Sequence, residues 1–289
     1  MNLSYPWEPK NQFSPCPNTA SNSTFTSQWP AEDGIQRSVG RSVEPMLQCI
    51  DANNVILHSW VDSIGGWELL IKSTAPNAIH NSRPEYDAPK SDEDTPIEVP
   101  SEITGWIEDR DGPQRLLCVT GAAGSGISAL QQKTAEECER NNILAASFFL
   151  SAADPTRNTA NTVVPTIAYQ LGRLNERLEW FIKTTVEKDL LIFTQSLKDQ
   201  INALIVRPFE HIRDSGMDLR SLPYVILIDA LDECKGEDRQ AELLTAIREC
   251  FLVDGLPFRI FITSRPERAI RPALEPGGHL HAVACHIQL

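Results

Sequence analysis

A glycine-rich stretch at residues 121–128 has residue types suited to binding phosphate. It follows a short apolar run and precedes a helix-like pattern, and backbone N–H groups at the start of a helix point at a bound anion. The phosphate-loop template G-x-x-x-x-G-K-[ST] is matched at Gly121, Gly126 and Ser128, whereas Ile127 stands where the template has lysine. We therefore predict a phosphate loop that lacks its lysine, with an unliganded glycine-rich turn as the alternative. Its residues are Gly121, Ala122, Ala123, Gly124, Ser125, Gly126, Ile127 and Ser128.

Three carboxylates follow an apolar run at residues 224–228. Ligands of a parallel sheet bind beyond the carboxyl ends of its strands, so Asp229 is expected to face the phosphate loop. There it would hold Mg²⁺, directly or through water, opposite the hydroxyl of Ser128. Asp232 and Glu233 come just after it, where a carboxylate orients or deprotonates an attacking water. A helix cap is the simpler explanation for a single strand-terminal Asp, but it accounts less well for three acids.

A further apolar run, at residues 258–262, ends in Thr263, Ser264 and Arg265. A guanidinium at this edge of a sheet can sense a γ-phosphate or the attacking water through hydrogen bonds; a surface ion pair is the alternative role. The loop, the acidic residues and Arg265 each come at the carboxyl end of an expected strand, so they converge on one site. The sequence therefore predicts a site for ATP or GTP with Mg²⁺.

The elements that must position these residues are apolar strands separated by helices. Strands are expected at residues 116–119, 143–150, 224–228 and 259–263, with a fifth inside 280–289. A helix-rich insert is expected at residues 159–213, broken near Asp189 and at Arg207-Pro208, and an amphipathic helix at 237–252. Continuous apolar strands alternating with helices indicate a parallel sheet covered on both faces. The predicted fold is therefore α/β, a P-loop NTPase with a parallel five-stranded sheet flanked by helices, plus a helical N-terminal extension.

Composition divides the chain into four parts. Residues 1–33 are rich in Ser, Asn, Pro and Thr and are expected to be a disordered tail. Residues 34–74 carry a helical apolar stripe and form an extension that either packs on the main domain or binds a protein partner. Residues 75–112 form a linker and a lead-in helix that Ser101 is expected to cap. Residues 113–289 form the nucleotide-binding domain.

The overall charge and the cysteines narrow the class of protein. A net charge of −13 argues against nucleic acid or an anionic membrane as a partner, because both attract clustered Lys and Arg. No apolar run approaches the roughly 20 residues that cross a bilayer, and the first residues do not resemble a secretory signal. The seven cysteines are scattered without ligand spacing, which favours free thiols. We therefore expect a cytoplasmic protein.

The three motifs and the segments between them resemble a known family. The runs that carry the resemblance are Ala75–Ser82, Ile143–Leu150, Thr166–Leu171, Ile228–Cys234 and Ile262–Glu267. Together they are similar to the NACHT branch of the signal-transduction (STAND) ATPases, most closely to fungal NACHT proteins with a nephrocystin-3-like N-terminal domain. The resemblance implies a signalling switch that changes conformation on nucleotide exchange or hydrolysis and forms homo-oligomers when active. It also implies that residues 121–128 bind phosphate, that Ser128 and Asp229 bind Mg²⁺, and that Arg265 belongs to a sensor segment.

Three departures from the family bear on function. Ile127 replaces the phosphate-binding lysine, Lys90-Ser91-Asp92 stands where the family has a Cys-His pair, and the family's further helical and winged-helix modules do not follow the fifth strand. We therefore expect a C-terminally truncated form of the domain.

The missing lysine would have made charge-assisted hydrogen bonds to phosphate, worth roughly 1.5–3 kcal/mol each. Their loss should weaken triphosphate binding about ten- to a few-hundred-fold. Hydrolysis should suffer more than binding, because charge accumulates in the transition state. The first hypothesis is thus a nucleotide switch with weak or no hydrolysis. The alternatives are a nucleotide-independent NACHT-like interaction or scaffold module, and a decayed copy or incomplete gene model.

Overall fold

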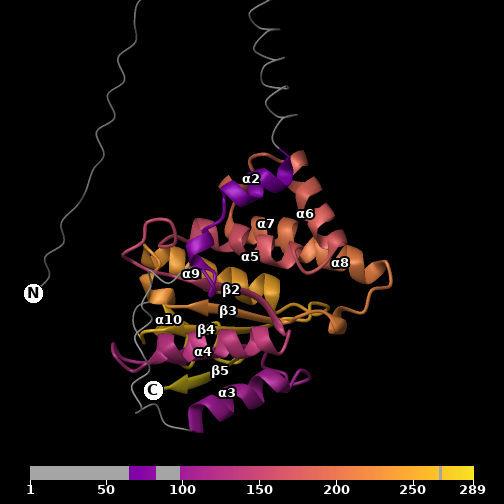
Figure 1. Ribbon diagram of the computed structural model, residues 1–289. Coiled ribbons are helices and arrows are strands. Elements are labelled where there is room, and N and C mark those ends of the chain that lie inside the picture. The colour runs from indigo at the N-terminus through magenta and orange to yellow at the C-terminus, as the bar shows by residue number, and fades with distance from the viewer. Residues whose placement is uncertain (1–64, 83–97, 267–268) are drawn as a thin grey trace, which may run out of the picture. The chain divides into compact units, whose positions relative to one another are not determined.

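The computed structural model describes residues 65–82, 98–266 and 269–289, and these are built around one parallel sheet. Its five strands lie in the order β2-β3-β4-β1-β5, and every pair of neighbours is parallel (Figure 1). The strands are β1 Leu116–Thr120, β2 Leu144–Phe149, β3 Val225–Asp229, β4 Arg259–Ser264 and β5 Ala284–Gln288. The predicted α/β fold with a parallel five-stranded sheet is therefore confirmed.

The sheet has an apolar layer on each face because successive side chains of a strand point to opposite sides. In β1, Leu116 and Cys118 pack into a larger core, while Leu117 and Val119 pack into a smaller one. The smaller core, here called the α3/α4 cluster, lies between the sheet and the helices α3 Glu98–Glu108 and α4 Ile127–Arg140. All residues of β1, β3 and β4 are buried, as expected for strands covered on both faces.

The helix-rich insert gathers beyond the β2 edge of the sheet, at the top of Figure 1. It contains α5 Val163–Gly172, α6 Glu176–Lys188, α7 Leu197–Ile201 and α8 Arg207–Asp214. The predicted break near Asp189 is confirmed, since α6 ends there. The predicted break at Arg207-Pro208 is wrong, because a π-helical turn, η4 Asn202–Val206, joins α7 to α8. Pro208 has no N–H to donate, and the wider turn before it carries the helical path onward.

Shorter helices complete the described residues. The predicted helix at 237–252 is α9 Glu237–Ala246 continued by a π-helical turn, η7 Ile247–Phe251, and α10 Ile270–Leu274 lies between β4 and β5. The 3₁₀ turns are η1 Pro76–Ala78, η2 Ala160–Thr162, η3 Ile192–Thr194, η5 Leu219–Ser221 and η6 Leu231–Glu233. Among the helices described here, none has both the length and the apolar character needed to cross a bilayer.

The lead-in helix α3 is held on the sheet by apolar contacts and by one arginine. Ile103 and Ile107 are buried in the α3/α4 cluster, and the guanidinium of buried Arg259 lies 4.2 Å from the ring centroid of Trp106. The prediction that Ser101 caps this helix is wrong, because α3 already includes Glu98. The helix can begin earlier because Pro100 lies in its first turn, where a missing N–H costs nothing.

Of the expected N-terminal extension, the structure describes only α2 Gly66–Lys72, which packs against α6. The expected tail at residues 1–33, most of the extension and the Lys90-Ser91-Asp92 segment lie outside the described residues. After α2, two backbone N–H groups tie the chain to the main body. Ala75 N donates to Thr166 Oγ1 at 2.9 Å, and His80 N donates to Ser147 Oγ at 3.1 Å.

The close approach of α2 to α6 predicts opposite effects for two helical glycines. A Cβ on Gly66 would overlap the carbonyl oxygen of Lys183 and the side chain of Glu187, whereas a Cβ on exposed Gly105 in α3 meets nothing. We expect Gly66→Ala to lower the free energy of unfolding by about 1–3 kcal/mol. Gly105→Ala should raise it by about 0.5–1 kcal/mol, because alanine is the better helix former. Urea unfolding of both variants measures this, and equal effects would contradict the packing described.

Candidate functional site

The glycine-rich loop connects the end of β1 to the first residue of α4, as the phosphate-loop template requires. Gly124 and Gly126 have φ values of 85° and 75°, which favour glycine. A Cβ on Gly121 would overlap the hydroxyl of Ser125, so the loop also needs glycine at its first position. The Ser125 Oγ is buried and has no hydrogen-bond partner among the described residues. A buried hydroxyl without a partner is uncommon in proteins.

Asp229 lies at the end of β3 with an exposed fraction of 1%. The hydroxyl of Thr263 in β4 donates to Asp229 Oδ1, and the hydroxyl of Ser128 in α4 also bonds to the carboxylate. Thr263 Oγ1 in turn accepts from Ala230 N at 3.1 Å. Burial raises the pKa of Asp229 to about 6, and the charges of Glu233 and Asp232 add to the rise, against the two hydroxyl bonds, which lower it. The structure thus places Ser128 and Asp229 together.

Asp232 and Glu233 follow on η6 and share one cation, Arg265. The turn before them is made by Ala230, a non-glycine residue with a φ of 55°. Asp232 Oδ1 accepts from Arg265 N at 3.0 Å, and Asp232 Oδ2 lies 3.5 Å from Arg265 Nε. Glu233 Oε1 lies 4.0 Å from Arg265 Nη2, while its Oε2 accepts from Ala152 N at 2.8 Å. The three residues that the sequence assigned to water handling and sensing are therefore in mutual contact.

The loop, the acids and Arg265 line one cleft of about 270 Å³. Its walls are Ala122, Ala123, Gly124, Ser125, Gly126, Ile127, Ser128, Ala129, Ala230, Asp232, Glu233, Ser264 and Arg265. Within this described lining, Arg265 is the positively charged side chain and it faces two acids. Two other cations, one on α4 and one after β2, do not line the cleft. Lys133 is exposed on α4, and Arg157 is buried against Asp154.

Ile127 is half-buried at the first position of α4. Its side chain packs against the α3/α4 cluster while also lining the cleft. The residue at the lysine position therefore contributes apolar contact rather than charge. A lysine here would need to run its stem along the same cluster to bring its ammonium into the cleft.

Sequence reasoning missed two features of this region. The first is the bond from Thr263 to Asp229; a hydroxyl ending the strand beside an acidic strand was its only sequence signal. The second is another cavity at the end of β1, described below, whose lining residues follow no motif.

The fold and this edge of the sheet define an α/β protein with a glycine-rich loop, an acidic strand end and an arginine strand end around one cleft. Residues 99–265 match the family model described as nephrocystin 3, N-terminal, which is more than half of the 289-residue chain. The chain therefore belongs to the nephrocystin 3 N-terminal family. The matched range begins in α3 and ends at Arg265, so it includes every residue of the cleft. No curated protein matches the chain.

The buried carboxyl of Asp229 predicts a pH dependence of stability. Its pKa is about 6 in the folded protein against an ordinary 3.8, so its favourable contribution is present below about pH 4 and is lost as the pH rises through about 6. Asp229→Asn removes this pH-dependent loss of stability, because the amide of asparagine does not ionise. Without Mg²⁺, we expect the variant to gain up to about 3 kcal/mol over the wild type above pH 6, and little near pH 4.

Urea unfolding of both proteins across this pH range measures the difference. Exposed Asp111, which pairs with Arg220 at 2.9 Å, gives the matched control Asp111→Asn, for which we expect no comparable pH-dependent gain. A pH-independent difference for Asp229→Asn would contradict the raised pKa.

Proposed function

We propose that the cleft binds Mg²⁺-ATP or Mg²⁺-GTP weakly and hydrolyses it slowly or not at all, so that the domain serves as a signalling switch of the NACHT type. The observation that carries the proposal is the convergence of a glycine-rich loop, an acidic strand end and an arginine at one edge of a parallel sheet. Polyphosphate with a divalent cation is the ligand class that matches those three groups together.

The loop supplies neutral donors for the phosphates. Its backbone N–H groups lie ahead of α4, and the buried hydroxyl of Ser125 has no described partner to give up when a phosphate oxygen arrives. Gly121 makes room for that hydroxyl, because a Cβ there would overlap the side chain of Ser125. These groups orient phosphate without contributing positive charge.

The residues present also fit Mg²⁺. Ser128 and Asp229 offer a hydroxyl and a carboxylate oxygen, which hard divalent cations prefer, and phosphate oxygens and water supply the other ligands. The bound cation supplies positive charge that offsets both the phosphates and the acids. The carboxylate of Asp229 would act on the cation directly or through water.

Arg265 has the position to respond to a γ-phosphate. Its contacts with Asp232 and Glu233 are 3.5 and 4.0 Å long and its side chain is half-exposed, so they hold it weakly. A γ-phosphate in the cleft competes for the guanidinium and makes shorter charge-assisted bonds. Asp232 or Glu233, once released, can then orient an attacking water. Slow hydrolysis is the expected result, because no lysine assists.

The wider functional proposals rest on the family. Nucleotide-dependent homo-oligomers, protein partners bound through the N-terminal segment and a cytoplasmic location fit a switch of this type. A second candidate function, a nucleotide-independent interaction or scaffold module, is favoured by one observation. Ile127 makes apolar contacts at the position of the template lysine, and Arg265 is paired with acidic side chains. These two side chains of the cleft therefore have partners without a bound ligand.

Restoring the lysine separates these two functions. We expect Ile127→Lys to strengthen Mg²⁺-ATP or Mg²⁺-GTP binding about ten- to a few-hundred-fold, because it restores charge-assisted bonds to phosphate. Isothermal titration calorimetry on the full chain measures the affinity. Ile127→Met is the control, since it keeps an unbranched apolar side chain without charge and should bind as the wild type does. Absence of binding in both the wild type and Ile127→Lys at millimolar nucleotide would leave the scaffold function.

Removing the arginine tests the sensing role separately. In the Ile127→Lys background, Arg265→Gln should weaken triphosphate binding about ten-fold through loss of one charged interaction. Diphosphate affinity should change much less, because the partner group is the γ-phosphate. Arg220→Gln, which breaks an exposed pair with Asp111 outside the cleft, is the matched control. Equal losses for di- and triphosphate would contradict a γ-phosphate contact.

A further inference from the structure

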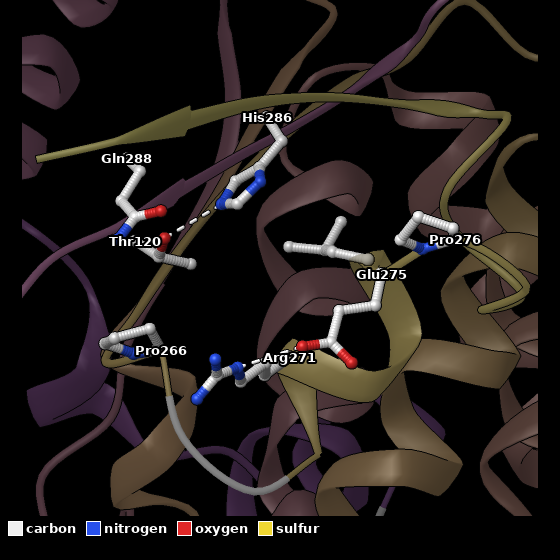
Figure 2. Close-up of a pocket in the computed structure, with 8 residues that line it drawn as sticks. Thr120, Pro266, Arg271, Glu275, Pro276, His286 and Gln288 are labelled. Carbon is white, nitrogen blue, oxygen red and sulfur yellow. Dashed lines mark hydrogen bonds and ion pairs between the residues drawn. The ribbon is translucent and has the colours of Figure 1, made fainter.

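A second cavity, of about 360 Å³, lies at the carboxyl end of β1 (Figure 2). Thr120 at the end of β1 forms part of its wall, and its side chain points to the same face as Cys118, opposite the α3/α4 cluster. The two cavities share no lining residue. The volume of the second falls within the range of roughly 300–1,000 Å³ that small-molecule sites have.

One side of this cavity is polar and comes from the two strands. Thr120 Oγ1 and His286 Nε2 are 2.8 Å apart, and Gln288 lies beyond them on β5 (Figure 2). Partial burial lowers the pKa of His286 below its ordinary value, which favours the neutral imidazole. Its Nε2 is engaged with Thr120, which leaves Nδ1 without a partner among the described residues.

The opposite side of the cavity comes from α10 and carries the guanidinium of Arg271, which is only partly paired. Arg271 Nε donates to Glu275 Oε1 at 3.0 Å, and the two terminal nitrogens of the guanidinium have no partner in the described part of the chain. The arginine side chain is 67% exposed, and an exposed pair of this kind contributes little to stability. Leu274, Pro266 and Pro276 add apolar surface to the same cavity.

We propose that this cavity is a binding site for a small organic acid, whose carboxylate or phosphate pairs with Arg271 and whose apolar body lies against Leu274, Pro266 and Pro276. The acid shares the guanidinium with Glu275 or displaces that carboxylate. His286 Nδ1 and the Gln288 amide supply a hydrogen bond to the body of the ligand. This proposal does not depend on nucleotide binding. The two sites are nonetheless adjacent in the sequence, since Thr120 directly precedes Gly121 of the glycine-rich loop and Pro266 directly follows Arg265.

Benzoate and phenyl phosphate are suitable probes, with benzyl alcohol as the uncharged comparison and inorganic phosphate as the anion without an apolar body. Binding to the full chain is measured by ligand-detected NMR, without nucleotide and then with Mg²⁺-ATP. We expect millimolar or tighter binding of one of the two aromatic anions, weaker binding of the other two compounds, and no competition from Mg²⁺-ATP. The anion that binds distinguishes a carboxylate site from a phosphate site.

Two exposed substitutions should act in opposite directions. Arg271→Gln should lower the affinity for the anion about ten-fold, and Glu275→Gln should raise that affinity several-fold by removing the competing carboxylate. Arg173 and Glu179 form a comparable exposed pair, 3.7 Å apart, outside this cavity. The variants Arg173→Gln and Glu179→Gln are therefore controls that should leave binding unchanged. Failure of both aromatic anions to bind, equal effects at the two pairs, or competition by Mg²⁺-ATP would each overturn the proposal.

Discussion

The carboxyl group of Asp229 is buried at the end of β3, where hydroxyls from β4 and from the first turn of α4 bond to it. A carboxylate in such a place is costly unless hydrogen bonds or a cation offset the loss of water. Thr263, Ser128 and Asp229 are far apart in the sequence, so their bonds set the relative positions of three elements. The turn at Ala230 is fixed by the same hydroxyl of Thr263, and Asp232 and Glu233 follow directly from that turn. The arrangement of the whole cleft thus depends on how this one carboxyl is held.

The charge balance of the cleft follows from the residues at its edge. Asp232 and Glu233 are the acids of the described lining and Arg265 is its cation, whereas the carboxyl of Asp229 is buried outside that lining. Under the proposed function, phosphate would bring further negative charge, which an accompanying metal ion would offset. Ile127 sharpens this requirement, since the position that normally adds a positive charge adds apolar contact instead. The proposed ligand is for this reason a metal–phosphate complex rather than free phosphate.

The sequence was sufficient for the sheet because its strands are short apolar runs bounded by turns, a pattern that few other structures share. It also placed Ser128, Asp229, Asp232 and Arg265 at one edge, since parallel strands bring their carboxyl ends together. It failed where local rules were overridden. Pro208 suggested a helix break that a π-helical turn avoids, and Ser101 resembled a cap although Pro100 allowed an earlier start. The cavity of His286 and Arg271 could not be found this way, because its walls come together only when β5 and α10 pack.

The two sides of the phosphate cleft are held by forces of different kinds. Ile127 fixes the loop through apolar contact with the α3/α4 cluster, which dissolved ions do not screen. Arg265 is held by long, partly exposed ionic contacts, which weaken as the Debye length shortens. Ionic strength therefore acts on the arginine side and leaves the loop side in place. The local salt concentration therefore changes how readily Arg265 separates from Asp232 and Glu233, without any change in the fold.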